Sequence, residues 1–363
     1  MVGAEKAITE GAASFERERP DIYGDAHPRD LLRAITEEHE HLQALANRHV
    51  ASAAQFERDQ LLQLFRLAAK YEANPDRFLT PIKPLSGKLL ISAFYEPSTR
   101  TRLSFESAWH RLGGDIMSIT DRTTTGIAKG ESLSDVAEMF NNYGDCVVLR
   151  DSNEDSVMQM MQSLRIPIIN AGNGTDEHPT QAMADLYTIL KWRPNLLAEK
   201  ARERIRIGII GVPCRMRTVR SLLKLLSRFP GMLKEVVVIH DGQDRELYSR
   251  GQKEALEEDG LKLRESTNLD KELPGLDVVY INAIAWVKDD FEVMGSELKL
   301  NSKSPLKSTA IILHPLARGD ELCTSLDDTP HNWYFAQARG AVFMRMALLT
   351  CMVQRTEMVM DVL

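Results

Sequence analysis

The architecture of this chain can be worked out from residues 88–115, KLLISAFYEPSTRTRLSFESAWHRLGGD. The apolar run over 88–95 is typical of a buried strand, and the apolar spacing over 102–113 is typical of an amphipathic helix. Three hydroxyls and two guanidiniums stand between them, from Ser98, Thr99, Arg100, Thr101 and Arg102. The stretch therefore predicts a strand-to-helix step whose helix starts with a dense cluster of hydrogen-bond donors.

The same alternation of strands and helices recurs along the chain. Further strands are expected at 115–120, 145–151, 166–172, 205–211, 235–241, 277–283 and 309–317. Further helices are expected at 132–144, 156–165, 178–193, 217–229 and 333–355. This rhythm predicts an α/β fold with two doubly wound domains, each a parallel sheet with helices on both faces.

Breaks in this rhythm give the expected domain bounds. The chain has 363 residues, more than a single hydrophobic core usually holds. A polar leader and helical patterns precede residue 50, and Pro194 with a charged run interrupts the alternation. The expected parts are a leader and helical extension at 1–49, a first α/β domain at 50–192, a second at 193–332 and a C-terminal helix at 333–363.

The composition argues against several classes of protein. The formal net charge of −7 does not suit a nucleic-acid-binding surface, and no apolar run is long enough to cross a membrane. The first 25 residues lack the apolar core of a signal peptide, so none is expected. The four cysteines have neither disulfide nor metal-ligand spacing, so we expect a cytoplasmic protein without a metal centre.

The loops that follow the strands are where a ligand is expected, because open parallel sheets bind ligands beyond the carboxyl ends of their strands. The first N–H groups of a helix lack partners and its dipole is positive there, so a helix start attracts anions. Here the hydroxyls of Ser98, Thr99 and Thr101 add donors, and Arg100 adds a bidentate charge. We expect a phosphate or other oxyanion site; the alternative is a plain N-cap with arginines facing water.

Polar residues also follow other strands. Lys129 lies in the loop AKGES, Arg150 directly follows the apolar CVVL, and His178 and Gln181 belong to the segment HPTQ before a helical run. Each has a structural alternative: a solvated lysine, a charge at the sheet edge, or a histidine that serves only the local structure. Because the carboxyl ends of parallel strands share one edge, we expect Arg150 and His178 to lie in the same crevice as the helix start.

These motifs together resemble the aspartate/ornithine carbamoyltransferase family, from about residue 50 to the C-terminus. The resemblance is carried by Ser98–Arg102 (STRTR), Lys129–Ser132 (KGES), Arg150, His178–Gln181 (HPTQ) and His314–Leu316 (HPL). The HPL form and the stretch TPHNWYFAQA are similar to the aspartate branch, which suggests pyrimidine biosynthesis. The resemblance implies that the C-terminal helix packs back on the first domain, that subunits form a homotrimer with shared sites, and that no metal or organic cofactor takes part.

The resemblance also implies how the first substrate, carbamoyl phosphate, would bind. Its phosphate would lie on Ser98–Thr101. Thr101, Arg150 and His178 would hydrogen-bond the carbonyl oxygen, where negative charge grows as an amine attacks. The expected catalytic residues are Arg100, Thr101, Arg150 and His178.

The remaining expected site residues orient the substrates. Gln181 and the backbone around Pro315 and Leu316 would orient the carbamoyl NH2. Lys129 would reach into the site of a neighbouring subunit, where it would contact both substrates. Arg217 would hold a carboxylate of the acceptor amine. All the expected partners are small molecules or copies of the same chain.

The acceptor side departs from the family pattern. The aspartate branch usually carries an Arg-x-Gln pair just after the strand at 277–283, and these positions, expected to line the acceptor pocket, are Ala283 and Ala285 here. Alanine cannot replace a guanidinium or an amide. Either Arg215 or Lys288 supplies the missing charge for L-aspartate, or the acceptor is a different amine.

Two other classes of protein fit the sequence less well. A nicotinamide dehydrogenase also has parallel α/β domains, but the strand-to-helix step GIIGVPCRMR lacks the G-x-G-x-x-G pattern. A non-catalytic relative acting as a binding or regulatory subunit predicts decay of the carbamoyl-phosphate ligands, and all of them are present. We therefore expect a carbamoyltransferase, with L-aspartate as the leading acceptor.

Overall fold

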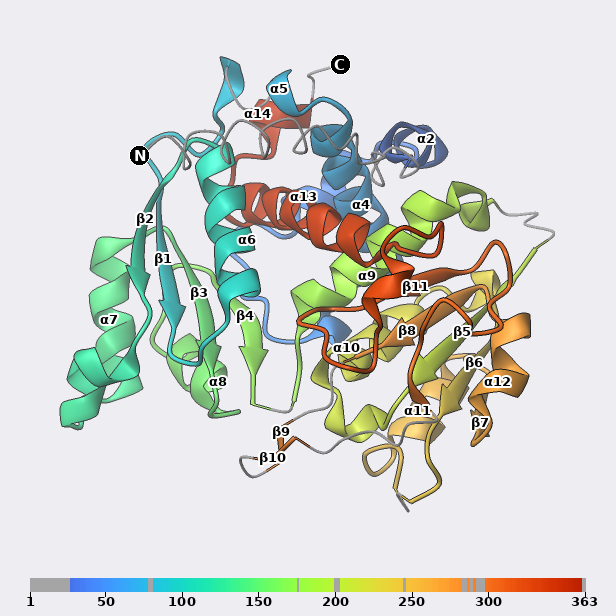
Figure 1. The fold of residues 1–363 in the computed structure, drawn as a ribbon. Coiled ribbons are helices and arrows are strands. Elements are labelled where there is room, and N and C mark those ends of the chain that lie inside the picture. Colours follow the sequence, from blue (N-terminus) through green and yellow to red (C-terminus); the bar gives the residue numbers. More distant parts are fainter. Residues whose placement is uncertain are drawn as a thin grey trace, which may run out of the picture.

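Two parallel sheets lie side by side in this protein, and helices cover both faces of each, as predicted (Figure 1). The computed structural model describes residues 27–77, 81–174, 176–198, 203–243, 246–282, 286–287, 290–291 and 298–360. The polar leader over 1–26 and the two alanines Ala283 and Ala285 lie outside the described residues, and so does Lys288. None of the described helices is long and apolar enough to span a bilayer.

The first sheet has the strand order β2-β1-β3-β4, with every pairing parallel. Its strands are β1 (Leu89–Phe94), β2 (Asp115–Ile119), β3 (Cys146–Asp151) and β4 (Ile168–Asn173). The helices that cover it include α6 (Thr99–Arg111), α7 (Leu133–Tyr143) and α8 (Ser156–Met161). Strands β3 and β4 are buried along their whole length, and the first four residues of β3, CVVL, are apolar without alternation.

The second sheet has the strand order β11-β8-β5-β6-β7 and is also parallel. Its strands are β5 (Ile205–Ile210), β6 (Leu233–Ile239), β7 (Leu263–Ser266), β8 (Val278–Ile281) and β11 (Ile311–Leu313). Its helices include α10 (Arg217–Leu226), α11 (Gln252–Glu258) and α12 (Leu269–Glu272). Strand β7 was not predicted, because this edge strand, LRES, is short and partly exposed and lacks an apolar run.

The N-terminal helical extension is less regular than its sequence pattern predicts. It is split into α2 (Pro28–Ala34) and α3 (His39–Gln43), followed by α4 (Arg58–Ala73). Gln63 on α4 explains the break: its Oε1 accepts from the backbone of Glu38 at 3.0 Å and its Nε2 donates to the carbonyl of Thr36 at 2.8 Å. These bonds replace ones that a continuous helix would make internally.

Two long helices hold the domains together. Helix α9 (Pro179–Trp192) ends the first α/β unit, and α13 (Tyr334–Met352), red in Figure 1, lies against α4, α6 and α9 although it is far from them in sequence. The fully buried Lys191 on α9 pairs with Glu72 of α4 at 2.8 Å. Helices α4, α6, α9 and α13 therefore pack together, although they come from distant parts of the sequence.

The shorter elements connect these layers. They are α5 (Pro75–Arg77), α14 (Glu357–Met360), the hairpin strands β9 (Trp286–Val287) and β10 (Asp290–Phe291), and the 3-10 turns η1 (Ala53–Gln55), η3 (Arg122–Thr124), η4 (Gly126–Lys129), η5 (Pro194–Leu197), η6 (Pro213–Arg215), η7 (Pro230–Met232), η8 (Leu273–Gly275) and η10 (Thr324–Leu326).

Candidate active site

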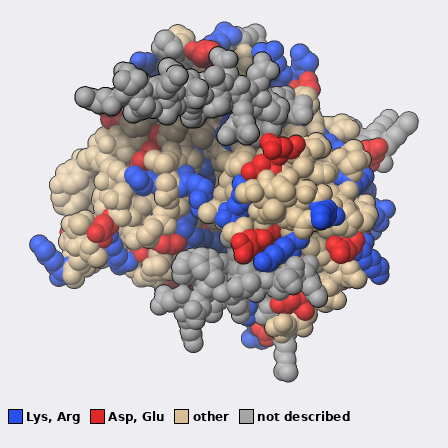
Figure 2. All heavy atoms as spheres, in the orientation of Figure 1, with Lys and Arg blue, Asp and Glu red and all other residues tan. Residues whose placement is uncertain are grey.

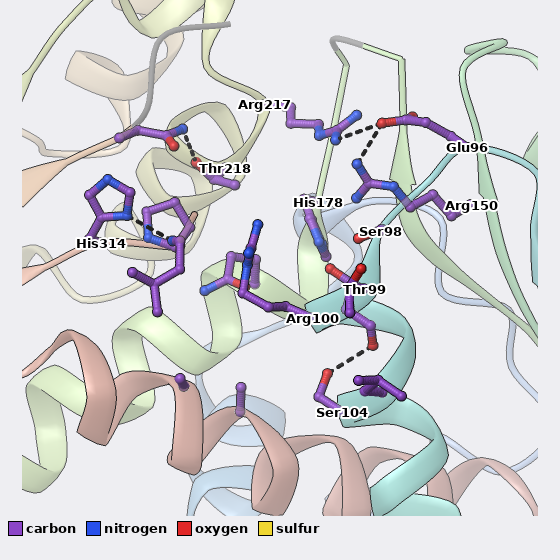
Figure 3. A pocket seen from close by; sticks show the side chains of 18 of the residues that line it. Glu96, Ser98, Thr99, Arg100, Ser104, Arg150, His178, Arg217, Thr218 and His314 are labelled. Atoms are coloured by element: carbon purple, nitrogen blue, oxygen red, sulfur yellow. Dashed lines mark hydrogen bonds and ion pairs between the residues drawn. The ribbon is translucent and has the colours of Figure 1, made fainter. Parts of the chain in front are cut away.

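A cavity of about 900 Å³ is lined by residues of both domains and of α13. The predicted site residues that line it are Ser98, Thr99, Arg100, Thr101, Arg150, His178, Gln181, Arg217, Pro315 and Leu316. Lys129 lies on the exposed turn η4, and the described lining of the cavity does not include it. Figure 2 shows basic side chains gathered where the two halves of this face meet, and Figure 3 shows the labelled residues converging on the cavity.

The start of α6 supplies the donors expected for an anion. Within the described structure Ser98 makes no side-chain capping bond to its own helix, which argues against the plain N-cap interpretation. Arg100 lines the cavity, and its partial burial lowers its pKa. Arg102, in contrast, pairs with Glu106 at 3.4 Å one turn along the helix and is not part of the described lining. The cluster therefore divides into cavity donors and one surface arginine.

Glu96 joins the two halves of the site. Its Oε1 accepts from Arg150 at 2.6 Å and from Arg217 at 3.3 Å, so one carboxylate bridges an arginine of each domain (Figure 3). Burial, and then the charge of Arg217, lower the pKa of Arg150 to about 10, although Glu96 opposes the shift. Glu96 was not predicted. Its position just after β1, two residues before the STRTR motif, was the available signal.

Gly172 makes this convergence possible. Its φ of +108° is a conformation that side chains disfavour, and a Cβ there would lie 3.0 Å from Nη1 of Arg150 and 3.3 Å from Cδ2 of His178. The same Cβ would lie 3.5 Å from Cζ of Arg217. Three predicted site residues thus crowd around one glycine, which the sequence analysis did not single out in NAGNG.

His178 is the N-cap residue of α9 and is only 3% exposed. Its backbone N–H donates to Oγ of Ser221 at 3.0 Å, and that hydroxyl donates to Glu177 at 3.1 Å. Burial and then the nearby arginines, Arg150 first, hold the pKa of His178 well below its usual value. The imidazole is therefore neutral near pH 7, and its buried Nδ1 has no hydrogen-bond partner within the described part of the chain.

Asp185 fixes the orientation of Gln181. Its Oδ1 accepts from Nε2 of Gln181 at 2.7 Å and from Nε2 of Gln337 at 2.6 Å, and its Oδ2 accepts from Tyr280 at 3.0 Å. Because the amide nitrogen of Gln181 is engaged, its carbonyl oxygen is the group left for a donor in the cavity. Burial raises the pKa of Asp185 to about 6. An acid four residues after Gln181, on the same helix face, was the missed signal.

Two further groups complete the walls. Nη1 of Arg345 on α13 donates to Oγ of Ser104 on α6 at 2.7 Å, and its guanidinium lies 4.7 Å from the ring centre of Phe105. A single arginine in the apolar run FMRMALL could have drawn attention to it. On the other side, Nδ1 of His314 accepts from the backbone of Leu316 at 2.8 Å and shapes the turn that exposes the HPL backbone.

The described residues hold no group of three or more His, Cys, Asp or Glu side chains placed to bind a metal ion. Arg215, suggested as a substitute for the missing acceptor ligands, does line the cavity beside Arg217. The acceptor side also includes Thr218, whose hydroxyl accepts from Asn282 at 3.2 Å. The described cavity is thus rich in cations and amides, which suits a substrate pair that carries phosphate and carboxylate groups.

Comparison with known proteins agrees with this arrangement. Residues 48–191 match the carbamoyl-P binding domain of the aspartate/ornithine carbamoyltransferases, and residues 203–352 match their Asp/Orn binding domain. The aspartate carbamoyltransferase catalytic subunit of Methanopyrus kandleri is 38% identical over 317 residues, covering 85% of this chain and 98% of the relative. That of Sulfolobus acidocaldarius is 36% identical over 309 residues, covering 84% and 98%.

Solved structures give the same result. The aspartate transcarbamoylase of Trypanosoma cruzi in complex with N-(phosphonacetyl)-L-aspartic acid superposes with a TM-score of 0.77 at 31% identity, covering 85% of this chain and 97% of that one. The same enzyme with carbamoyl phosphate and aspartate gives 0.76 at 31% identity, covering 86% and 98%. The chain therefore belongs to the aspartate/ornithine carbamoyltransferase family.

Proposed function

We propose that this chain transfers the carbamoyl group of carbamoyl phosphate to the amino group of L-aspartate, which gives N-carbamoyl-L-aspartate and phosphate. One observation carries the proposal: the start of α6, Arg150 and the neutral His178 converge on one cavity. The names of the relatives, and the complex of the Trypanosoma cruzi enzyme with both substrates, support it.

In the proposed reaction the phosphate of carbamoyl phosphate lies on the donors of Ser98–Thr101. The amine nitrogen forms a bond to the carbamoyl carbon, the bond from that carbon to the phosphate oxygen breaks, and the departing phosphate takes the amine proton. Thr101, Arg150 and His178 donate to the carbonyl oxygen as its negative charge grows. Catalysis then rests on positioning and on charge stabilisation by fixed donors.

The substrates are oriented by the other walls of the cavity. Gln181, held by Asp185, accepts from the carbamoyl NH2, together with backbone carbonyls of the turn at Pro315 and Leu316. Arg217 binds a carboxylate of the acceptor. Since Arg217 is paired with Glu96 in the described structure, the acceptor carboxylate competes with that pairing.

The test is phosphate release from carbamoyl phosphate with a panel of amines that includes L-aspartate and L-ornithine. The proposal predicts release with L-aspartate and formation of carbamoyl aspartate. No release with aspartate, alongside release with another amine, would contradict the acceptor but not the chemistry. No release with any amine would favour the non-catalytic relative.

A second acceptor is favoured by Ala283 and Ala285, which stand where the aspartate branch carries Arg and Gln. An amine without a side-chain carboxylate, or a bulkier one, suits an alanine-lined wall. The double variant Ala283→Arg/Ala285→Gln tests this candidate. A gain in aspartate use over the unmodified chain would support it, and a folded variant without any gain would count against it.

We further propose that the chain is a cytoplasmic homotrimer in which Lys129 completes the site of a neighbour. The exposed position of Lys129, away from the described lining of its own cavity, supports this. We also propose that the two α/β domains extend over residues 50–192 and 193–332. Sedimentation equilibrium of the purified chain tests the assembly, and a monomer with full activity would contradict it.

A further inference from the structure

Residues 121–131 form the loop that carries Lys129, and the loop is internally well bonded. Oδ1 of Asp121 accepts from the backbone and the hydroxyl of Thr123 at 2.8 and 2.7 Å. The hydroxyl of Thr125 donates to the carbonyl of Arg122 at 2.7 Å. Ile127 packs against the apolar cluster on the outer face of the first sheet. The described loop is therefore a shaped support with Lys129 on its exposed side.

One ion pair ties this loop to the sheet. Nη1 of Arg122 donates to both carboxylate oxygens of Asp151, at 3.0 and 2.9 Å. Asp151 is only 1% exposed, and Oγ of Ser156 also donates to it at 2.6 Å. The guanidinium of Arg122 lies 5.9 Å from the ring centre of Tyr95. A charge-assisted bond to a buried acid is a stronger anchor than an exposed surface pair.

The anchor is built on the same strand ends as the cavity. Asp151 directly follows Arg150, and Tyr95 directly precedes Glu96. Successive residues of extended backbone point to opposite sides, so Arg150 and Glu96 meet at the cavity while their neighbours meet Arg122. The backbone N–H of Tyr95 also donates to the carbonyl of Arg150 at 2.8 Å. The loop is thus attached to the backbone that carries the cavity's buried arginine.

We propose that Arg122 and Asp151 are positioning residues whose ion pair holds Lys129 in place to complete the cavity of a neighbouring subunit. This inference rests on the proposed carbamoyl transfer and homotrimer. Neither residue lies among the described lining of the cavity, so their effect is exerted through the loop. Removing the Arg122 side chain loosens the loop. The buried Asp151 still has a hydrogen-bond donor, because Ser156 remains bonded to it.

The first test is a double-mutant cycle with Arg122→Ala, Lys129→Ala and the combined variant. Each single change is expected to lower kcat/KM for carbamoyl phosphate about 10- to 100-fold, as misplacement of a binding group does. The combined variant is expected to lie within about twofold of Lys129→Ala, because both changes remove the same contact. If Arg122→Ala lowers kcat/KM by the same factor in the unmodified chain and in the Lys129→Ala variant, the proposal is overturned.

Two variants serve as controls in that cycle. Arg122→Lys keeps a charge near Asp151 and is expected to recover part of the loss. Arg165→Ala removes another ion pair of the first domain, the exposed one with Glu138 at 2.8 Å, and is expected to change kcat/KM less than about twofold. A loss with Arg165→Ala as large as with Arg122→Ala would assign the effect to general stability and contradict positioning.

The second test asks whether the loop acts on a neighbour. Subunits with Arg122→Ala have an intact cavity and a loosened loop, whereas subunits with Arg100→Ala have an intact loop and a damaged cavity. Mixed trimers of the two are expected to be more active than either parent. In them, the intact loop of an Arg100→Ala subunit can complete the intact cavity of a neighbouring Arg122→Ala subunit. No recovery in mixed trimers would overturn the proposal.

Failure of the proposed function would look different from failure of this inference. In the first case the unmodified chain would release no phosphate with any amine, whereas in the second only the variants would depart from expectation. The same mutant cycle can be measured without turnover, from the affinity for carbamoyl phosphate determined by calorimetry. If the losses in binding free energy from Arg122→Ala and Lys129→Ala add up in the combined variant, the inference is contradicted.

Discussion

The two halves of the cavity differ in how their ligands are supported. On the proposed carbamoyl-phosphate side, the expected donors come from the start of α6, the end of β3 and the start of α9, and buried side chains such as Ser221 and Asp185 hold the residues of α9. On the acceptor side, the described residue proposed to bind the acceptor is Arg217 at the start of α10, and the sequence has alanines where the aspartate branch carries Arg and Gln. The proposed carbamoyl-phosphate donors are therefore held by buried contacts within the described chain, whereas the acceptor side is where the sequence departs from the family pattern.

The largest effect is expected from Arg100→Ala, on the carbamoyl-phosphate side. Loss of this charged donor should lower kcat about 10²- to 10³-fold, as removal of a transition-state donor does. Arg102→Ala is the matched control, because Arg102 pairs with Glu106 and lies outside the described lining. Steady-state phosphate release measures both. Comparable losses from the two variants would mean that the helix start has no special role.

The next effect is expected on the acceptor side, from Arg217→Ala. Losing hydrogen bonds to a charged group costs about 1.5–3 kcal/mol, so KM for the acceptor should rise about 10- to 150-fold. The affinity for carbamoyl phosphate, measured by calorimetry, should change much less. Arg220→Ala, one turn along α10 and paired with Asp176 at 3.4 Å, is the control. If Arg217→Ala weakens the binding of both substrates equally, the two halves of the cavity do not bind separate substrates.

A smaller effect is expected at the seam, where Asp185 contacts groups from both domains. In Asp185→Leu the apolar side chain has no oxygen that could accept from Gln181 and Gln337, so both bonds are lost. Freed to rotate, Gln181 should orient the carbamoyl group poorly, and kcat should fall about tenfold. Thr188→Ala, one turn along α9, is the buried control. An unchanged kcat would show that the orientation of Gln181 is immaterial.

The smallest effect concerns the charge state of His178. Its pKa is lowered in the fold, so as pH falls below 6.5 the unfolded chain binds the proton first and stability decreases. Between pH 6.5 and 5.5 the unmodified chain should lose about 1 kcal/mol more unfolding free energy than His178→Asn. Urea unfolding of both proteins at the two pH values measures this. An equal loss in both would mean that the imidazole takes up its proton equally in the folded and the unfolded chain, which contradicts a lowered pKa.

Much of the fold could be predicted because strands such as β8 and β11 are buried along their whole length and consist of continuous apolar runs. The polar strand β7 and the break after α2 could not, since edge pairing and the bonds of Gln63 depend on tertiary contacts. Most site residues identified in advance are polar residues at the strand ends or in the segments that follow the strands. Glu96 and Asp185 stand near predicted site residues in the sequence, but their bonds to Arg150, Arg217 and Gln181, like the crowding around Gly172, are seen only in the folded arrangement.

The return of α13 to the first domain has a consequence for how such a protein can change. The chain leaves the first domain after α9 and comes back before α13, and these two helices pack against each other. The second domain is thus an insertion whose two ends lie at one seam. In genetic terms, one continuous gene segment encodes this domain. Recombination at the codons between α9 and α13 would therefore exchange the acceptor half as a unit. New acceptors can then arise by exchange of the second domain, while the first-domain residues Ser98–Thr101, Arg150 and His178 are inherited unchanged.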